Sequence, residues 1–250
     1  MTKSQINKLG ERLRAAVDLD SELLAQLQRF RASYDEPMSK VQSRLGEIGL
    51  EATSRLKTVN TIIEKLRRER TRLAEMQDIA GLRIVSEADL EEQDAIVKRI
   101  VDVFPVASVI DRRNKPSHGY RAVHVIPLFD DRPIEIQVRT QLQDSWAQAM
   151  ERLADEAGRS VRYGGNPEAR GKDVEDLLSI SVEIARTEDM LTSLNRMERA
   201  VPPPQRAPRD QRTLRLHLAA IQSLRTRVHR QDGAIRAMLE TIVRGRGTSK

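Results

Sequence analysis

The chain has 250 residues, of which 32% are charged and 3% aromatic, and its formal net charge of +6 favours anionic partners such as nucleotides or RNA. It contains no cysteine, which excludes disulfides and thiolate metal sites, and its charged, aromatic-poor composition favours a helix-rich protein over an all-β sandwich. Because it has no apolar leader and no uncharged apolar stretch of about 18 residues, we expect a cytoplasmic protein that is neither exported nor membrane-spanning.

The first part of the sequence has helical periodicity. Apolar residues at steps of three and four over residues 6–27 predict one long helix or a pair of helices before Pro37. A short helix is expected after Pro37, then a break at 46–49, then a helix that continues into a basic segment at 67–72. No strand is predicted in this part.

The middle of the chain predicts a sheet, because its short apolar runs are rich in β-branched residues. Four strands are expected, at residues 82–85, 106–110, 122–128 and 134–138. A helix over 89–103 separates the first two strands, and Asp130 with Asp131 predicts a hairpin turn between the last two. The predicted fold class is α+β, with a mixed β-sheet flanked by helices.

Helical periodicity returns from Thr140 to about residue 157, and again over 174–191 after a glycine-containing loop. A proline-rich linker is followed by a last helix in which an apolar residue recurs at every seventh position. These positions are Leu214, Ile221, Val228, Ile235 and Ile242. We expect this apolar stripe either to contact another copy of the chain or to pack back onto the N-terminal helices. The expected organisation is a helical extension (1–50), a core (51–160), a second helical extension (161–200), the linker (201–208) and a basic helix (209–250).

Two acidic residues lie where α/β folds place their sites, at or near strand ends. Asp78 comes directly before the first predicted strand, although it could also be a solvated turn residue. Side-chain alternation places Glu135, Gln137 and Arg139 on one face of the fourth strand. A face with a carboxylate, an amide and a guanidinium is not expected to pack in the core, although it could equally be a solvated outer face of the sheet.

A basic turn at 115–121 leads to the next strand, and the period of two places Tyr120, Ala122 and His124 on one side. Because the chain has only one Trp, three Tyr and three Phe, a tyrosine beside a glycine in a basic loop favours stacking on a flat ligand over core filling. His124 is either a structural histidine or a donor to a phosphate or ribose oxygen.

Carboxylates from two segments suit a shared Mg²⁺, which prefers oxygen ligands and bridges substrate phosphates. Basic residues upstream suit the charge of a triphosphate, although a solvated helix face would give the same pattern. They are Arg55, Lys57, Lys65, Arg67 and Arg68. No glycine-rich segment precedes a Lys-Ser or Lys-Thr pair, so side chains rather than a Walker loop would hold the phosphates.

Three segments resemble, in order, the signature stretches of RelA/SpoT-type alarmone synthetases. They are 78–83 (Asp-Ile-Ala-Gly-Leu-Arg), 119–124 (Gly-Tyr-Arg-Ala-Val-His) and 135–140 (Glu-Ile-Gln-Val-Arg-Thr). The resemblance covers about residues 55–156. It implies a nucleotidyltransferase-like fold and transfer of pyrophosphate from ATP to a ribose 3′-hydroxyl, with release of AMP.

The resemblance also implies a role for each residue. Asp78 and Glu135 would hold Mg²⁺, and Glu135 would draw the proton from the attacking hydroxyl. The residues implied to bind ATP are Arg55, Lys57, Lys65, Arg83 and Lys115. The residues implied to bind the acceptor are Tyr120, which would stack on the base, and His124, Gln137 and Arg139.

Two departures from the family pattern bear on the function. Many members have Lys-Pro-Asn-Gly-Tyr, whereas residues 115–120 here read Lys-Pro-Ser-His-Gly-Tyr, which leaves the acceptor open. The chain also lacks the His-Asp motif of the family's hydrolase domain and a long regulatory C-terminus. It therefore resembles the small, synthetase-only branch, whose members often form homo-oligomers.

Three functions follow from these features. The leading one is synthesis of (p)ppGpp from ATP and GDP or GTP. The second is pyrophosphorylation of the 3′ end of tRNA, as in toxic members of the branch that have an antitoxin partner, and the arginine-rich last helix suits RNA. The third is an inactive nucleotide- or RNA-binding regulator, against which the presence of both Asp78 and Glu135 argues.

Overall fold

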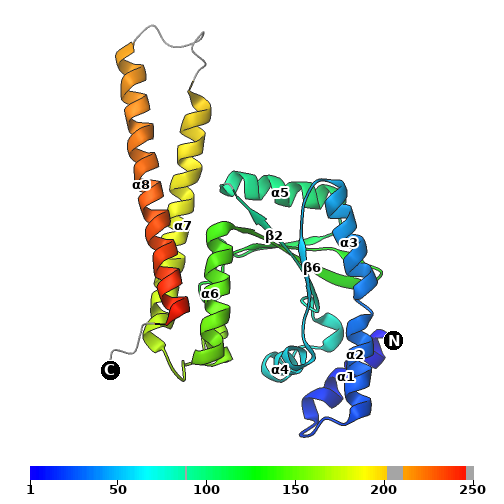
Figure 1. The fold of residues 1–250 in the computed structure, drawn as a ribbon. Helices are drawn as coiled ribbons and strands as arrows, with labels where there is room; N and C mark the ends of the chain where they lie inside the picture. Colours follow the sequence, from blue (N-terminus) through cyan, green and yellow to red (C-terminus); the bar gives the residue numbers. More distant parts are fainter. Residues whose placement is uncertain (88, 202–210, 246–250) are drawn as a thin grey trace. The chain divides into compact units, whose positions relative to one another are not determined.

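The computed structural model of the protein describes residues 1–87, 89–201 and 211–245 (Figure 1). The chain divides into two compact units, and each is described by itself. Unit 1 comprises Met1–Ile84, Ile96–Ile110 and Val123–Val138, and unit 2 comprises Val85–Ala95, Asp111–Ala122 and Arg139–Lys250. Apart from Val201, the predicted proline-rich linker lies outside the described residues.

Unit 1 begins with helices. They are α1 (Lys3–Ala15), α2 (Ser21–Ala32), α3 (Asp35–Glu47) and α4 (Val59–Glu69). The predicted pair of helices before Pro37 is confirmed, and so is the break at 46–49. Helix α3 begins at Asp35 rather than after Pro37, because the first turn of a helix has free amides and therefore tolerates proline. The basic segment extends beyond its helix, because α4 ends at Glu69 and the next residue, Arg70, has a left-handed conformation.

The sheet has six strands in the order β1-β2-β6-β4-β3, with β5 paired to β6 (Figure 1). They are β1 (Thr53–Leu56), β2 (Ala80–Ser86), β3 (Ser108–Asp111), β4 (Val123–Ile126), β5 (Leu128–Phe129) and β6 (Arg132–Thr140). The predicted fold class, the four predicted strands and the helix between the first two, α5 (Leu90–Val103), are confirmed. The predicted hairpin turn is confirmed as well, because Asp130 and Asp131 both have positive φ and join the paired strands β5 and β6.

The prediction of no strand before Asp78 was wrong. Strand β1 pairs antiparallel with β2, with Arg55 opposite Gly81. Three of its four residues are exposed, so the strand has no apolar run that a sequence pattern could reveal.

The core of unit 1 covers one face of the sheet. Ile134, Ile136 and Val138 alternate along β6 and are fully buried in this core, together with Leu82 and Ile84 of β2. Because side chains alternate along a strand, the intervening residues of β2 and β6 lie on the other face. That face carries the predicted site residues of both strands.

Unit 2 contains three long helices. They are α6 (Gln141–Ala157), α7 (Gly171–Ala200) and α8 (Gln211–Arg244), with a 3-10 turn, η2 (Arg159–Tyr163), after α6. The predicted helices here are confirmed. Ile221 and Val228 of the apolar stripe pack with Leu194 of α7, and Ile235 and Ile242 join a cluster built from α6 and α7. The side chain of Leu214 lies outside the described residues.

The apolar stripe of α8 is therefore buried within unit 2. Packing onto the N-terminal helices was the wrong expectation for these residues, because α6 and α7 cover them. The same burial removes them as a free surface for a second copy of the chain. Within the part of the chain that the structure describes, no helix is both long and apolar enough to cross a membrane.

Candidate active site

Asp78 is held between two lysines in unit 1. Pairing of β1 with β2 continues past the strand ends, where the Lys57 amide donates to the Ile79 carbonyl at 2.8 Å. This contact places Lys57 Nζ 2.8 Å from Asp78 Oδ2, and Lys65 Nζ from α4 reaches the same oxygen at 2.9 Å. The three side chains are 15%, 20% and 23% exposed for Lys57, Lys65 and Asp78, so Asp78 is not a solvated turn residue.

The lysines keep Asp78 ionised despite its burial. Burial alone raises the pKa of Asp78, but the charges and hydrogen bonds of Lys57 and Lys65 outweigh it and lower the pKa below its usual value. For Lys65, burial lowers the pKa, and the charge and hydrogen bond of Asp78 reverse this so that the pKa is raised. Asp78 and Lys65 are thus both charged at neutral pH.

Glu135 lies in a second cluster of unit 1, on the non-core face of β6. The register of β4 and β6 sets His124 opposite Gln137, diagonal to Glu135. His124 Nδ1 lies 2.9 Å from Glu135 Oε1, and Gln137 Nε2 donates to Glu135 Oε2 at 2.6 Å. Glu135 is 9% exposed and His124 is 7% exposed, so the alternative of a solvated outer face is wrong for these residues.

The two carboxylates influence each other electrostatically. Burial raises the pKa of Glu135, the hydrogen bond and charge of His124 lower it, and the charge of Asp78 raises it; the net pKa is lowered. Two ionised carboxylates that repel each other bind a divalent cation favourably, because the cation removes the repulsion.

The donor atoms fit a hard divalent cation. Asp78 Oδ1 is buried and has no hydrogen-bond partner among the described residues, so one carboxylate oxygen is available to a ligand. Each oxygen of Glu135 accepts one hydrogen bond and keeps a further lone pair. Among the described residues no group of three or more His, Asp or Glu could hold a metal ion by itself. The carboxylate oxygens of Asp78 and Glu135 are of the kind that Mg²⁺ takes, since it commonly binds one or two carboxylates and completes its shell with water and substrate phosphates.

Two predicted ATP-binding arginines lie on the same sheet face as Glu135. The register places Arg55 opposite Gly81 and Arg83 opposite Thr53, which puts both arginines on the face opposite the core residues of β2. Arg55 is exposed and Arg83 is half-buried. The positive charge of unit 1 thus extends from the lysine pair along the edge of the sheet.

Tyr120 and Arg139 meet in unit 2. Arg139 Nη2 donates to the Tyr120 hydroxyl at 3.1 Å, and the guanidinium carbon lies 5.1 Å from the ring centroid. Arg139 is also paired with Asp144 of α6 at 2.9 Å, and Gln148 donates to the other oxygen of Asp144 at 2.6 Å. Sequence analysis missed Asp144, although its place five residues after Arg139, at the start of a helix, was visible.

The loop before Tyr120 forms a tight two-residue turn. Ser117 and Tyr120 exchange backbone hydrogen bonds of 3.2 and 3.0 Å, and between them His118 and Gly119 have φ of 50° and 83°. Positive φ at both central residues is typical of a type I′ turn. Strand β4 begins only at Val123, so regular strand alternation covers only His124 of the three residues Tyr120, Ala122 and His124, and their place on one side stays a prediction.

Lys115 is exposed in unit 2. Its predicted role toward ATP stays a prediction.

Comparison with known proteins identifies the region that contains these clusters. Residues 54–154 match the family model described as the region found in RelA / SpoT proteins. We call this matched segment the RelA/SpoT region. The matched residues include Asp78, Glu135 and Tyr120, whereas α7 and α8 lie beyond the RelA/SpoT region.

Relatives and solved structures agree with this match. The uncharacterized protein Rv1366 of Mycobacterium tuberculosis is 37% identical over 174 residues, which are 67% of this chain and 64% of the relative, so the match spans less than two thirds of the relative's length. The small alarmone synthetase 1 from Bacillus subtilis is 26% identical with a TM-score of 0.53, covering 68% of this chain and 96% of that one. The same synthetase bound to its product pppGpp is 25% identical, also with a TM-score of 0.53.

The pairing of Asp78 in the RelA/SpoT region predicts a pH-dependent stability. Because folding lowers the pKa of Asp78 from its ordinary 3.8, the ion pairs stabilise the fold above about pH 4, and their contribution is lost as the pH falls through the folded pKa. Asp78→Asn should therefore lower the free energy of unfolding at pH 7 by about 2 kcal/mol. The difference should shrink at pH 3, as measured by urea denaturation.

The control is Asp102→Asn, which breaks an exposed ion pair with Lys98 in the same unit and should change stability little at either pH. An equal loss for Asp78→Asn at both pH values would contradict the charged pairing.

Proposed function

We propose that the protein transfers the β,γ-pyrophosphate of ATP to the 3′-hydroxyl of GDP or GTP, which yields (p)ppGpp and AMP. The observation that carries the proposal is the pair of ionised carboxylates, half-buried Asp78 and buried Glu135, of which Asp78 has one oxygen without a partner and two lysines on the other. A second support is the similarity to a small alarmone synthetase that is described with its product pppGpp.

The basic residues of unit 1 account for binding of ATP. Lys57 and Lys65 hold their ammonium groups beside Asp78, and a triphosphate approaching that carboxylate would meet both charges. Arg55 and Arg83 add positive charge on the non-core face of the sheet. In phosphoryl transfer, such charges stabilise the negative charge that spreads over the transferring group.

Glu135 is the proposed general base. Its lowered pKa leaves a carboxylate that can accept the proton of the ribose 3′-hydroxyl as the 3′-oxygen attacks the β-phosphorus of ATP and AMP departs. His124 and Gln137 fix the orientation of this carboxylate through the hydrogen bonds described above. Mg²⁺ held by Asp78 and Glu135 would neutralise phosphate charge during the transfer.

Tyr120 is the proposed platform for the acceptor base, with Arg139 fixing its hydroxyl. Because base–aromatic stacking contributes about 1–3 kcal/mol, Tyr120→Ala should raise the KM for the acceptor about 10- to 100-fold and leave the KM for ATP unchanged. Steady-state kinetics with each substrate varied in turn measures both values.

The matched control is Tyr163→Ala, which removes an exposed tyrosine of unit 2. Unaltered acceptor KM in Tyr120→Ala would remove the stacking role.

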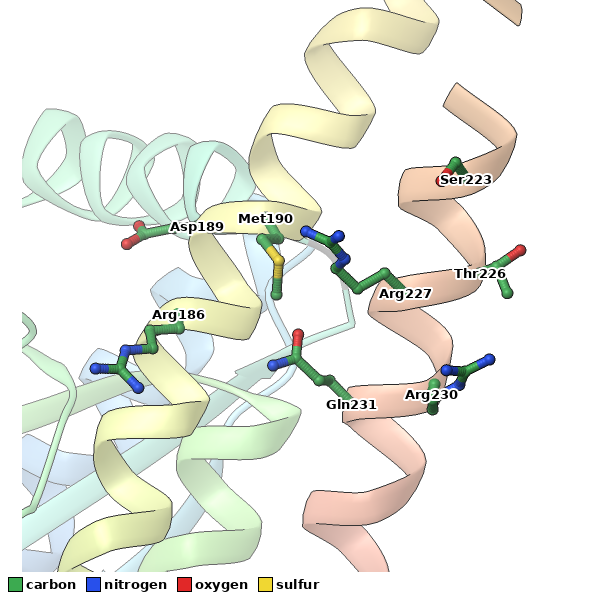
Figure 2. Close-up of a pocket in the computed structure, with 8 residues that line it drawn as sticks. All are labelled: Arg186, Asp189, Met190, Ser223, Thr226, Arg227, Arg230 and Gln231. Carbon is green, nitrogen blue, oxygen red and sulfur yellow. The ribbon is translucent and has the colours of Figure 1, made fainter. Parts of the chain in front are cut away.

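A second candidate acceptor is the 3′ end of tRNA, and one observation favours it. Helices α7 and α8 line a groove in unit 2 that carries basic side chains (Figure 2). Its lining residues are Arg186, Asp189, Met190, Ser223, Thr226, Arg227, Arg230 and Gln231. Arg227 and Arg230 are exposed and form no ion pair with any acidic side chain in the described part of the chain, so their charge is available to a polyanion.

Transfer of label separates these candidates. The purified protein is incubated with Mg²⁺ and ATP labelled in the β- and γ-phosphates, together with GDP, GTP or bulk tRNA. Labelled guanine nucleotide with stoichiometric AMP supports the proposed function. Label on tRNA would mean that the acceptor is tRNA rather than GDP or GTP. Release of no AMP with any acceptor would sink the proposed enzyme and favour a nucleotide- or RNA-binding regulator.

A further inference from the structure

Ser181 of α7 holds both neighbours of Tyr120 in sequence. Its hydroxyl donates to the Gly119 carbonyl at 2.5 Å, and Arg121 Nε donates to both the Oγ and the carbonyl oxygen of Ser181 at 3.1 Å. The hydroxyl therefore uses its one proton and a lone pair on the residues before and after Tyr120. Ser181 is 2% exposed, so water cannot replace these bonds without a change in packing.

The turn itself is packed tightly against α6 and α7. A Cβ atom on Gly119 would lie 2.7 Å from Cζ2 of Trp146 and 3.1 Å from Cδ2 of Leu178, and the positive φ of Gly119 also disfavours any other residue. Trp146 is in turn fixed by a hydrogen bond of 2.6 Å from Nε1 to the Leu177 carbonyl. Packing contacts and a hydrogen bond thus both restrain Gly119 in the turn.

A second residue of α7, Glu188, holds the chain next to Arg139, the residue of β6 that pairs with Tyr120. Glu188 lies seven residues after Ser181, which is two helical turns along the same face. It accepts hydrogen bonds from the Thr140 hydroxyl and, at 3.1 Å, from Gln143 Nε2. Thr140 directly follows Arg139, whose guanidinium bonds the Tyr120 hydroxyl.

We propose that α7, which lies outside the matched RelA/SpoT region, positions Tyr120 for the acceptor, with Ser181 as the principal positioning residue. Ser181 acts through Gly119 and Arg121 and does not itself touch a substrate. The functional half of this inference rests on the proposed function, whereas its structural half, the restraint of the turn, can be measured in the protein without any substrate.

The test compares Ser181→Ala with Ser179→Ala. Ser179 lies on the same helix and is exposed, and among the described residues its side chain bonds only the Glu175 carbonyl of that helix, so it is a matched control. Two substrate-free measurements report on the turn. One is hydrogen exchange of the amides at 117–121, and the other is the fluorescence of Trp146, the chain's single tryptophan, which lies against Gly119.

In Ser181→Ala we expect faster exchange at 117–121 and a changed Trp146 emission. We also expect a KM for the acceptor raised roughly tenfold, the fold-change of about one lost hydrogen bond, with the KM for ATP unchanged. Ser179→Ala should match the wild type in all four measurements.

Arg121→Ala provides a second variant, which removes both hydrogen bonds from Arg121 to Ser181 and so shares the bond to Oγ with Ser181→Ala. If Ser181 acts through Arg121, the double variant should raise the acceptor KM by less than the product of the two single effects.

The outcomes are distinguishable. Unchanged exchange and emission in Ser181→Ala overturn the inference whether or not the protein is active. A loosened turn with unchanged acceptor KM reduces Ser181 to a purely structural residue and also overturns it. Absence of transfer in the wild type defeats the proposed function alone, and equilibrium binding of GDP to wild type and Ser181→Ala then decides whether the turn positions Tyr120 for a bound nucleotide.

Discussion

Glu135→Gln is expected to abolish pyrophosphate transfer, with kcat lowered about 1,000-fold or more, while the affinity for ATP stays close to that of the wild type. The substitution keeps the shape of the side chain but removes its charge and its ability to accept a proton. Loss of a general base typically lowers the rate roughly 10²- to 10⁴-fold. Transfer is measured with labelled ATP, and affinity with a non-hydrolysable ATP analogue by calorimetry.

Glu36→Gln is the control, since it applies the same substitution to an exposed residue of unit 1 that forms an ion pair with Lys40. The control should be as active as the wild type. A Glu135→Gln protein that transfers pyrophosphate at an undiminished rate would show that Glu135 is neither base nor metal ligand.

Asp78→Asn is expected to have the second largest effect, a loss of about 1,000-fold in activity that added Mg²⁺ does not restore. The substitution removes the oxygen that is free for a cation and the charge that orients Lys57 and Lys65. Charge stabilisation by a bound metal contributes several kcal/mol, and about 1.4 kcal/mol corresponds to a tenfold change in rate.

The dependence of the rate on Mg²⁺ concentration checks this prediction, with Asp102→Asn as the matched control. A Mg²⁺ dependence in Asp78→Asn identical to that of the wild type would contradict the assignment of Asp78 as a ligand.

Much of the fold was predictable because it depends on local patterns. The alternation of Ile134 and Ile136 with Glu135 correctly predicted a strand with a core face and a polar face. The helical period correctly predicted α6, α7 and α8. Both patterns reflect burial of one side of an element, which is a property the sequence carries residue by residue.

Strand β1 could not be predicted in this way, because its stability comes from backbone pairing with β2 rather than from a buried face. The partner of the α8 stripe was also hidden. Its spacing predicts that Ile221 and Val228 are buried, but not which helix buries them, since any apolar surface of matching shape would do.

The roles of the predicted site residues stay predictions, and the residues that support them in the structure were not predicted. Asp78 and Glu135 were recognised from their places near strand ends, whereas Asp144, Ser181 and Glu188 were not. Each of these three interacts with a residue of the predicted site or its sequence neighbour across a turn or a long segment of chain. A polar residue on a helix gives no sign in the sequence of which distant group it will bond.

The central claim is that Asp78 and Glu135 share one divalent cation. Crystals grown with Mn²⁺ in place of Mg²⁺ and a non-hydrolysable ATP analogue test it directly through anomalous diffraction. We predict an anomalous peak about 2.1–2.3 Å from a carboxylate oxygen of each residue, close to the distances usual for small divalent cations, and in contact with the phosphates of the analogue. A well-ordered analogue with its cation bound to neither carboxylate would contradict the account.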